Sequence, residues 1–218
     1  MLKEYHKIET PYKRDTEGTK KLIEGDFRSN AIKQFKDCKW IFTEKIDGTN
    51  IRVYWDGHSF SFHGRTDRAK LPQDLVHRLE DLFNNDAMEQ LVEQMFGDKE
   101  VILFGEGYGP GIQAVGKEYR VNSKDFIMFD VMVDGKYLNH SDMCDIATAL
   151  NIPYSPVSLV GTIDDAVEFV KTNPVSKIGT CVIEGVVGRL PIDTYDGRGN
   201  RLIVKIKCKD FVQSTPSM

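Results

Sequence analysis

Residues 40–63 read WIFTEKIDGTNIRVYWDGHSFSFH, and the interpretation of the whole chain starts from this stretch. Three short runs within it are rich in β-branched and aromatic residues, which favour strands: 40–46, 50–55 and 58–63. Asp47-Gly48 and Asp56-Gly57 separate the runs, and such pairs are typical of tight turns between antiparallel strands. We therefore expect three consecutive strands joined as a meander.

The hydrophobic period then changes from strand to helix. Leu71, Leu75, Leu79, Leu82 and Phe83 fall on one helical face, which predicts a helix over 71–83. The same reasoning predicts three later helices: one through Leu91 and Phe96 that Gly97 ends, one from an N-cap at Ser141 to Leu150, and one over 164–172. Strand composition returns in four segments: 100–106, 126–132, 180–187 and 202–208. The first 39 residues indicate turns, a short helix and an edge strand.

This order of elements predicts an α+β fold, because clusters of strands are interrupted by segregated helices. We expect two mainly antiparallel sheets with flanking helices. Composition agrees with a globular chain, with 40% hydrophobic and 28% charged residues in 218. The net charge of −4 excludes a bulk polyanion binder of the histone kind, so any nucleic-acid contact needs a local basic groove.

Membrane and secretory features are absent from the sequence. No apolar stretch approaches the roughly 20 residues that cross a bilayer, and the opening residues lack the apolar region of a secretory signal. We therefore expect a cytoplasmic protein with no membrane partner. The four cysteines, at positions 38, 144, 181 and 208, form no C-x-x-C pair. Buried or free thiols are favoured over a metal set or disulfides.

Two glycine patterns resemble phosphate-binding loops without meeting their requirements. Residues 111–117 fit G-x-x-x-x-G-K, but Glu118 follows where a P-loop needs Ser or Thr to hold magnesium. The alternating glycines of FGEGYGPG lack the G-x-G-x-x-G spacing and the βαβ context. They indicate instead a backbone that turns tightly or approaches a ligand closely.

Charged residues interrupt several otherwise apolar strands. Lys205, Lys207 and Lys209 alternate in 202–208 and just beyond, so they share one face. Other charges occupy comparable positions: Lys45, Glu106, Asp130 and Glu184. One interpretation is a sheet with one wet face. The other is a groove for a polyphosphate and a divalent metal, with lysines for phosphates and carboxylates for the cation and ribose hydroxyls.

These residues carry a resemblance to a known superfamily. Residues 45–50, KIDGTN, resemble motif I of the covalent nucleotidyltransferases, which include polynucleotide ligases and mRNA-capping enzymes. The remaining motifs follow in order from about residue 40 to 211: Arg65 in HGRTD, Glu106 in FGEGYGPGIQ (motif III), Phe129-Asp130 in DFIMFDV (motif IIIa), Glu184-Gly185 in VIEGVV (motif IV), and Lys205 and Lys207 in NRLIVKIK (motif V).

Within the superfamily the chain is most similar to the phage-type RNA ligase 2 family. Asn50 and the stretch 105–113 match that family, whereas Asp47 stands where its best-known member has His. Family members carry a further C-terminal domain, but only 11 residues follow Lys207 (218 − 207). We therefore expect a single adenylyltransferase domain over 1–218, with no separate C-terminal sealing domain.

The resemblance implies a nucleotidyltransferase, or ATP-grasp-like ligase, domain with a nucleotide-binding groove. It implies an ATP-dependent RNA ligase that acts through lysyl-AMP and needs Mg²⁺ or Mn²⁺. The nucleophile would be Lys45, with Lys205 and Lys207 at the α-phosphate. The other implied roles are ribose binding by Glu106, adenine stacking by Phe129, reading of the adenine edge by the Glu44 backbone, AMP transfer by Asn50 and Arg65, and metal binding by Glu184. Asp130 has no certain role and could be structural.

A lysine amine is nucleophilic only when neutral, and its ordinary pKa is about 10.4. Cationic neighbours lower such a pKa, so nearby lysines and the metal would activate the nucleophile. If the strand register is shifted by two residues, Lys209 replaces Lys205.

The implied partners are RNA ends, a 5′-phosphate and a 3′-hydroxyl, with a nicked duplex as one candidate arrangement. The segment 196–210 carries a local charge of +3 and could bind such a strand, or it could be an ordinary solvated turn. A capping-type guanylyltransferase, a small DNA ligase, and a nucleotide- or RNA-binding module without sealing activity stay open as alternatives.

Overall fold

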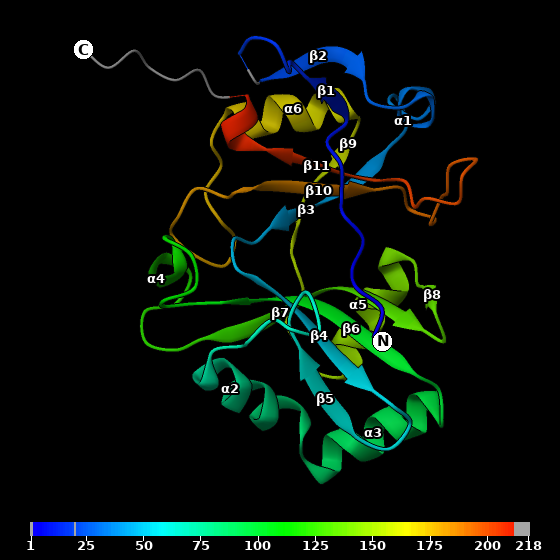
Figure 1. Ribbon diagram of the computed structural model, residues 1–218, viewed down its shortest axis with the longest axis vertical. Helices are drawn as coiled ribbons and strands as arrows, with labels where there is room; N and C mark the ends of the chain where they lie inside the picture. The colour runs from blue at the N-terminus through cyan, green and yellow to red at the C-terminus, as the bar shows by residue number, and fades with distance from the viewer. Residues whose placement is uncertain (1, 20, 212–218) are drawn as a thin grey trace. The chain divides into compact units, whose positions relative to one another are not determined.

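The computed structural model describes residues 2–19 and 21–211, and the chain divides into two compact units (Figure 1). The first, called here the five-stranded unit, comprises Met1–His6 and Ile46–Ser155. The second, the four-stranded unit, comprises Lys7–Lys45 and Pro156–Met218. Lys45 and Ile46 are consecutive residues, so the predicted nucleophile is the last residue before the chain enters the five-stranded unit.

The five-stranded unit contains an antiparallel sheet in the order β5-β4-β6-β7-β8. Its strands are β4 (Thr49–Trp55), β5 (Phe60–His63), β6 (Val101–Tyr108), β7 (Asp125–Val133) and β8 (Lys136–Tyr137). Its helices are α2 (Gln73–Phe83), α3 (Asp86–Phe96), α4 (Gly116–Tyr119) and α5 (His140–Ala149). Helix α2 begins at Gln73, two residues after the predicted start, and α3 ends where Gly97 adopts a φ of 60°.

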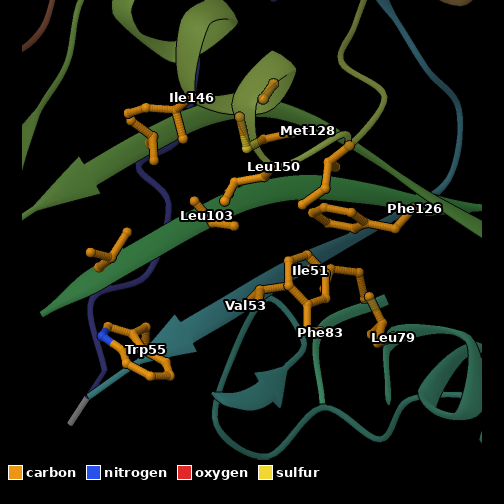
Figure 2. Packing of buried hydrophobic residues seen from close by; sticks show 14 of the residues in the cluster. Ile51, Val53, Trp55, Leu79, Phe83, Leu103, Phe126, Met128, Ile146 and Leu150 are labelled. Carbon is orange, nitrogen blue, oxygen red and sulfur yellow. The ribbon is translucent and has the colours of Figure 1, made fainter. Parts of the chain in front are cut away.

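One face of this sheet forms the hydrophobic core of the unit (Figure 2). Ile51 and Val53 of β4 pack there with Leu79 and Phe83 of α2, and all four are fully buried. The periodicity of 71–83 follows from this packing, because a helix on a sheet buries one stripe of side chains. Each such burial contributes roughly 1.5–3 kcal/mol.

A β-bulge interrupts the pairing of β6 with β7. Phe104 lies opposite Asp130, and the next residue of β6 lies opposite Met128, so Phe129 is an extra residue on β7. Met128 and Val131 both belong to the core. The bulge therefore keeps two successive residues, Phe129 and Asp130, off the core face, which simple alternation would not do.

The four-stranded unit contains an antiparallel sheet in the order β11-β10-β3-β9. Its strands are β3 (Trp40–Lys45), β9 (Val157–Gly161), β10 (Gly185–Arg189) and β11 (Ile203–Lys207). A separate ribbon pairs β1 (Tyr12–Arg14) with β2 (Leu22–Phe27), and two helices complete the unit, α1 (Asn30–Gln34) and α6 (Ile163–Lys171). Helix α6 begins with a capping box between Thr162 and Asp165, and its apolar stripe packs against Val204 and Ile206 of β11.

The expected α+β fold with antiparallel sheets is confirmed, and all four cysteines are free thiols. The expected meander is confirmed for its second hairpin, in which β4 pairs with β5, but is wrong for its first. Strand β3 pairs with β9 and β10 in one sheet, whereas β4 pairs with β5 and β6 in the other. Both edges of β3 are already occupied by other strands, so Asp47-Gly48 connects two sheets instead of closing a hairpin.

Other boundaries also differ from expectation. Helix α5 begins at His140 with Asn139 as its N-cap, so Ser141 is inside the helix. The ladder of β10 begins at Gly185, later than the predicted start at 180. Strand β11 ends at Lys207, and Lys209 lies in the 3-10 helix Cys208–Asp210. Among the helices within residues 2–19 and 21–211, none has the length and apolar character needed to cross a membrane.

Candidate active site

Two predicted catalytic lysines lie in one row across the four-stranded sheet. Gly185, the first residue of β10, is opposite Lys45 on β3 and opposite Lys207 on β11. Lys45 and Lys207 are each the last residue of their strand. Antiparallel pairing therefore brings both lysines to the end of the sheet where β10 begins.

Glu184, the residue just before β10, binds both lysines. Its Oε2 accepts a hydrogen bond from the Lys45 ammonium, and its Oε1 forms an ion pair with Lys207. The exposed fractions of the side chains are 25% for Lys45, 16% for Glu184 and 20% for Lys207. The group is therefore accessible to solvent without being fully solvated. The backbone carbonyl of Glu184 also accepts from the Cys208 amide at 3.0 Å, which fixes this carboxylate beside the end of β11.

The charges of this cluster shift two ionisation equilibria. Burial alone would raise the pKa of Glu184, but the ammonium groups of Lys45 and Lys207 outweigh it and hold that pKa below its ordinary value. Lys205 lies two residues before Lys207 on the same face of β11. Burial, with the positive charges of Lys207 and Lys45, lowers the pKa of Lys205. The sheet thus concentrates positive charge around one carboxylate.

Gly185 is required by the close approach of two backbones. A Cβ at this position would lie 2.1 Å from the Ile206 carbonyl oxygen and 2.7 Å from the Lys207 Cα. Its φ of 157° also lies where L side chains are rarely found. Because any larger residue would separate β10 from β11, the glycine sets how near Glu184 comes to Lys207.

Glu44 is buried next to the predicted nucleophile, on β3. Its carboxylate accepts hydrogen bonds from the Ser176 hydroxyl at 2.5 Å and from the Lys177 amide at 2.9 Å. Its own amide donates to the Pro156 carbonyl at 2.9 Å. The side chain therefore fixes the segment around Ser176, a role that its place before Lys45 in the sequence did not indicate. The predicted contact of its backbone with adenine stays a prediction.

Asn50 and Glu106 lie opposite each other on β4 and β6 in the five-stranded unit. Gly48 makes this arrangement possible, because a Cβ there would lie 2.3 Å from the Gly107 carbonyl oxygen and 2.7 Å from the Glu106 Cγ. The Asn50 Oδ1 atom is buried, and within residues 2–19 and 21–211 it accepts no hydrogen bond. A buried amide oxygen without a donor is costly, so this atom is suited to accept a bond from a ligand.

The turn before β4 is held by the glycine-rich loop that follows β6. The Gln113 side chain donates to the Gly48 carbonyl at 3.0 Å, and the Asp47 amide donates to the Tyr119 hydroxyl at 3.2 Å. This loop therefore supports the K-x-D-G turn and is not a P-loop. The sequence indicated the stretch that ends at Gln113, but not its contact with Gly48 or the role of Tyr119.

Phe129 is half-buried and packs edge-on against Tyr5, with ring centroids 5.1 Å apart. The Tyr5 hydroxyl donates to the Asp130 carboxylate at 2.6 Å, and Asp130 is fully buried. Asp130 thus anchors the N-terminal segment through Tyr5, which agrees with the structural role suggested for it. Tyr5 was missed because it precedes its partner by 125 residues.

Arg65 is exposed in the segment after β5.

The predicted basic surface of 196–210 is weaker than its sequence implies. Arg201 is buried and its Nε donates to Asp193 at 2.7 Å, while Asp210 pairs with Arg14 at 2.9 Å. The Arg201 charge is therefore not displayed to solvent, although Arg198 is exposed.

Residues 2–19 and 21–211 contain no group of three or more His, Cys, Asp or Glu side chains that could hold an ion. Glu184 is a partly exposed carboxylate that forms ion pairs with Lys45 and Lys207. That donor set fits Mg²⁺, which binds proteins through one or two carboxylates together with substrate phosphates and water.

A cavity of about 370 Å³ in the five-stranded unit contains none of the predicted site residues. Residues that line it include Lys3, Tyr54 and Glu100, and the Tyr54 hydroxyl donates to Glu100 at 2.7 Å. The chemistry of the lysine cluster therefore does not coincide with this cavity, and we assign the cavity no role.

This chain matches one known protein family and resembles several solved structures. The model of the RNA ligase family matches residues 38–207. Similar solved structures are forms of RNA ligase from Naegleria gruberi. A mutant with AMP and Mn is 17% identical, with a TM-score of 0.62, over 92% of this chain and 60% of that chain. A mutant with ATP and Mn is 19% identical, with a TM-score of 0.62, over 81% of this chain and 52% of that chain.

A third structure, the same organism's RNA ligase with PPi, is 18% identical with a TM-score of 0.62, over 94% of this chain and 62% of that chain. At these identities the likeness shows the fold. The chain spans between 52% and 62% of the length of these three structures. The comparison with curated proteins finds no match.

Proposed function

Because the chain belongs to the RNA ligase family, whose model matches residues 38–207, we propose that it is an ATP-dependent RNA ligase acting through a covalent lysyl-AMP intermediate. The observation that carries the proposal is the cluster in which Glu184 binds both Lys45 and Lys207 at one end of the four-stranded sheet. A sheet face that is merely exposed to solvent would not require a carboxylate that two lysines share.

In the proposed first step, the Lys45 Nζ attacks the α-phosphate of ATP. A nitrogen–phosphorus bond forms, the bond to the β-phosphate oxygen breaks, and pyrophosphate leaves. The attacking amine must first lose a proton and leave its ion pair with Glu184, since a protonated ammonium has no lone pair. Lys205 and Lys207 offset the phosphate charge throughout, and such positioning and electrostatics supply most of the catalysis in phosphoryl transfer.

A divalent cation fits beside Glu184. Mg²⁺ or Mn²⁺, held by this carboxylate and by phosphate oxygens, would supply additional positive charge at the reacting phosphate. Glu184 pairs with two lysines in the structure, so a cation at this carboxylate would compete with their ammonium groups for it. Release of Lys45 is the exchange that the reaction needs.

The roles of the remaining residues rest on the resemblance. Glu106 binds ribose hydroxyls, Phe129 stacks on adenine, and the Glu44 backbone reads the adenine edge. Asn50 and Arg65 assist transfer of AMP to the RNA 5′-phosphate. The exposed position of Arg65 and the unsatisfied oxygen of Asn50 support these two assignments.

The proposed substrates are RNA ends, with a 5′-phosphate that receives AMP and a 3′-hydroxyl that then displaces it. A nicked duplex is the proposed arrangement, since it presents both ends together. A single adenylyltransferase domain and a cytoplasmic location stay predictions of the sequence.

Intact-protein mass after incubation with ATP and magnesium, in parallel with GTP, tests the proposal. We expect a gain of one AMP in the wild-type chain and none in Lys45→Ala. Lys33→Ala removes an exposed lysine of the same unit and serves as the matched control, which should gain AMP normally. A GMP adduct would indicate capping chemistry instead, and a folded protein that binds ATP without any adduct would indicate a binding module.

A further inference from the structure

Arg52 is a fully buried arginine at the centre of β4, on the face opposite the hydrophobic core. Its neighbours Ile51 and Val53 point into that core, so alternation directs Arg52 the other way, to the same side as Asn50. Moving a guanidinium out of water is costly unless it is paired and hydrogen-bonded. The partners of Arg52 therefore indicate why the chain retains a charge here.

Those partners belong to two segments distant from β4 in sequence. The Nε atom donates to the Gly64 carbonyl at 2.7 Å, and an Nη2 hydrogen donates to the Asp67 carboxylate at 2.9 Å. The Nη1 atom donates to the carbonyls of Leu2 and Lys3 at 3.0 and 3.4 Å. Two of these contacts bracket Arg65, one on each side.

The bracketed segment, residues 64–69, is folded tightly on itself. The Ala69 amide donates to the Thr66 carbonyl at 3.1 Å, and a Cβ on Gly64 would lie 2.7 Å from the Ala69 Cβ. Arg65 is exposed, and no acidic side chain in the described part of the chain forms a salt bridge with it. The hydrogen bonds of Arg52 thus fix the backbone of this segment, while the Arg65 guanidinium stays exposed.

We propose that Arg52 is a positioning residue for ligation, which holds the backbone on both sides of Arg65 and thereby sets where Arg65 meets the phosphate. The inference rests on the proposed function, because it supplies the reason that Arg65 must be placed accurately. Arginine suits this role because its planar fork donates in several fixed directions at once. Lysine keeps the charge but cannot reach Gly64, Asp67 and the N-terminal carbonyls together.

The test compares substitutions of Arg52 and Arg65 in separate steps of the reaction. Lysyl-AMP formation is followed by intact mass, and AMP transfer and sealing are followed on a 5′-phosphorylated nicked RNA duplex in single-turnover experiments. We expect Arg65→Ala and Arg52→Lys to impair the same step, each by about 10²-fold, the loss that a displacement near 1 Å can cause. Asp67→Asn keeps Arg52 and should impair that step by a smaller factor, even if Arg52→Lys folds poorly.

Double variants decide whether Arg52 acts through Arg65. If it does, adding Arg52→Lys or Asp67→Asn to Arg65→Ala should reduce the rate by no more than about twofold further. Losses that multiply in the double variants would overturn the inference. The inference would also be overturned if the Arg52→Lys single variant transferred AMP at the wild-type rate while the Arg65→Ala single variant was impaired.

Two controls separate positioning from general destabilisation and from failure of the proposed function. Leu79→Ala, in the core of the same unit, lowers stability without touching the segment and should leave the ratio of step rates unchanged. Amide hydrogen exchange measures positioning without any activity, and Arg52→Lys should raise exchange at Ala69 by roughly tenfold. Faster exchange in a chain that forms no lysyl-AMP would uphold the positioning contact and reject the ligase assignment, whereas unchanged exchange would reject the positioning itself.

Discussion

Gly185→Ala is the substitution whose consequence the structure defines most sharply. The new Cβ would lie 2.1 Å from the Ile206 carbonyl oxygen, whereas a carbon and an oxygen in contact are about 3.3 Å apart. Strands β10 and β11 must therefore separate by about 1.2 Å at their first pair, the difference between these two distances. The three atoms nearest to the new Cβ are all backbone atoms of Ile206 and Lys207, so no side-chain rotation relieves the overlap.

The energetic cost combines overpacking with an unfavourable φ. We expect the free energy of unfolding to fall by about 2–4 kcal/mol, which corresponds to a loss of roughly 5–15 °C in Tm for a chain of this size. The separation also moves Glu184 relative to Lys207. A displacement near 1 Å at a reacting centre can reduce the rate by about 10²-fold, so lysyl-AMP formation should slow by that order.

The assay measures thermal unfolding and the rate of AMP attachment by intact mass on the same samples. Gly197→Ala is the matched control, because this glycine lies in the connection between the same two strands and a Cβ there meets nothing within 4 Å. It should leave both quantities unchanged. A Gly185→Ala protein with wild-type Tm and wild-type adenylylation would refute the argument that close strand approach places Glu184.

The other predictions concern one partly buried and one fully buried carboxylate. The pKa of Glu184 is lowered in the folded chain, so its stabilising contribution is present above its ordinary pKa of about 4.5 and is lost as pH falls through the lower folded value. Urea unfolding of Glu184→Gln should therefore show a deficit at pH 7 that shrinks below pH 4.5, and a deficit independent of pH would contradict the ion pairing. Asp130→Ala leaves the buried Tyr5 hydroxyl without its acceptor and should cost about 2–4 kcal/mol. Tyr5→Phe in that background should recover part of the loss, and strictly additive losses would show that the two groups are not coupled.

Much of the local structure was predictable because its signals are local. The apolar period of 71–83 identifies helix α2, whose stripe packs on a sheet. The ordered motifs around Lys45, Glu106, Glu184 and the motif V lysines carry the resemblance that predicts the chemistry. Family membership and the α+β fold agree with those expectations.

Strand partnership was not predictable from the same signals. The runs on either side of Asp47-Gly48 look like a hairpin, yet they belong to different sheets. A strand's composition shows that it is extended but does not show which edge it will join, because pairing depends on the other strands that compete for that edge. The bulge at Phe129 was not predictable for a similar reason. A bulge is an extra residue relative to the paired strand, so it can be recognised only when the pairing of β7 with β6 is known.

The sequence by itself determined which residue types are present, their order and their local periods, and these suffice for element types and for the motif set. Only the tertiary structure decided that one carboxylate, Glu184, serves both Lys45 and Lys207, and that Arg52 holds the segment around Arg65. The physical reason is that hydrogen bonds and ion pairs act over about 3 Å in space, whereas these partners are separated by 12 to 139 residues in sequence.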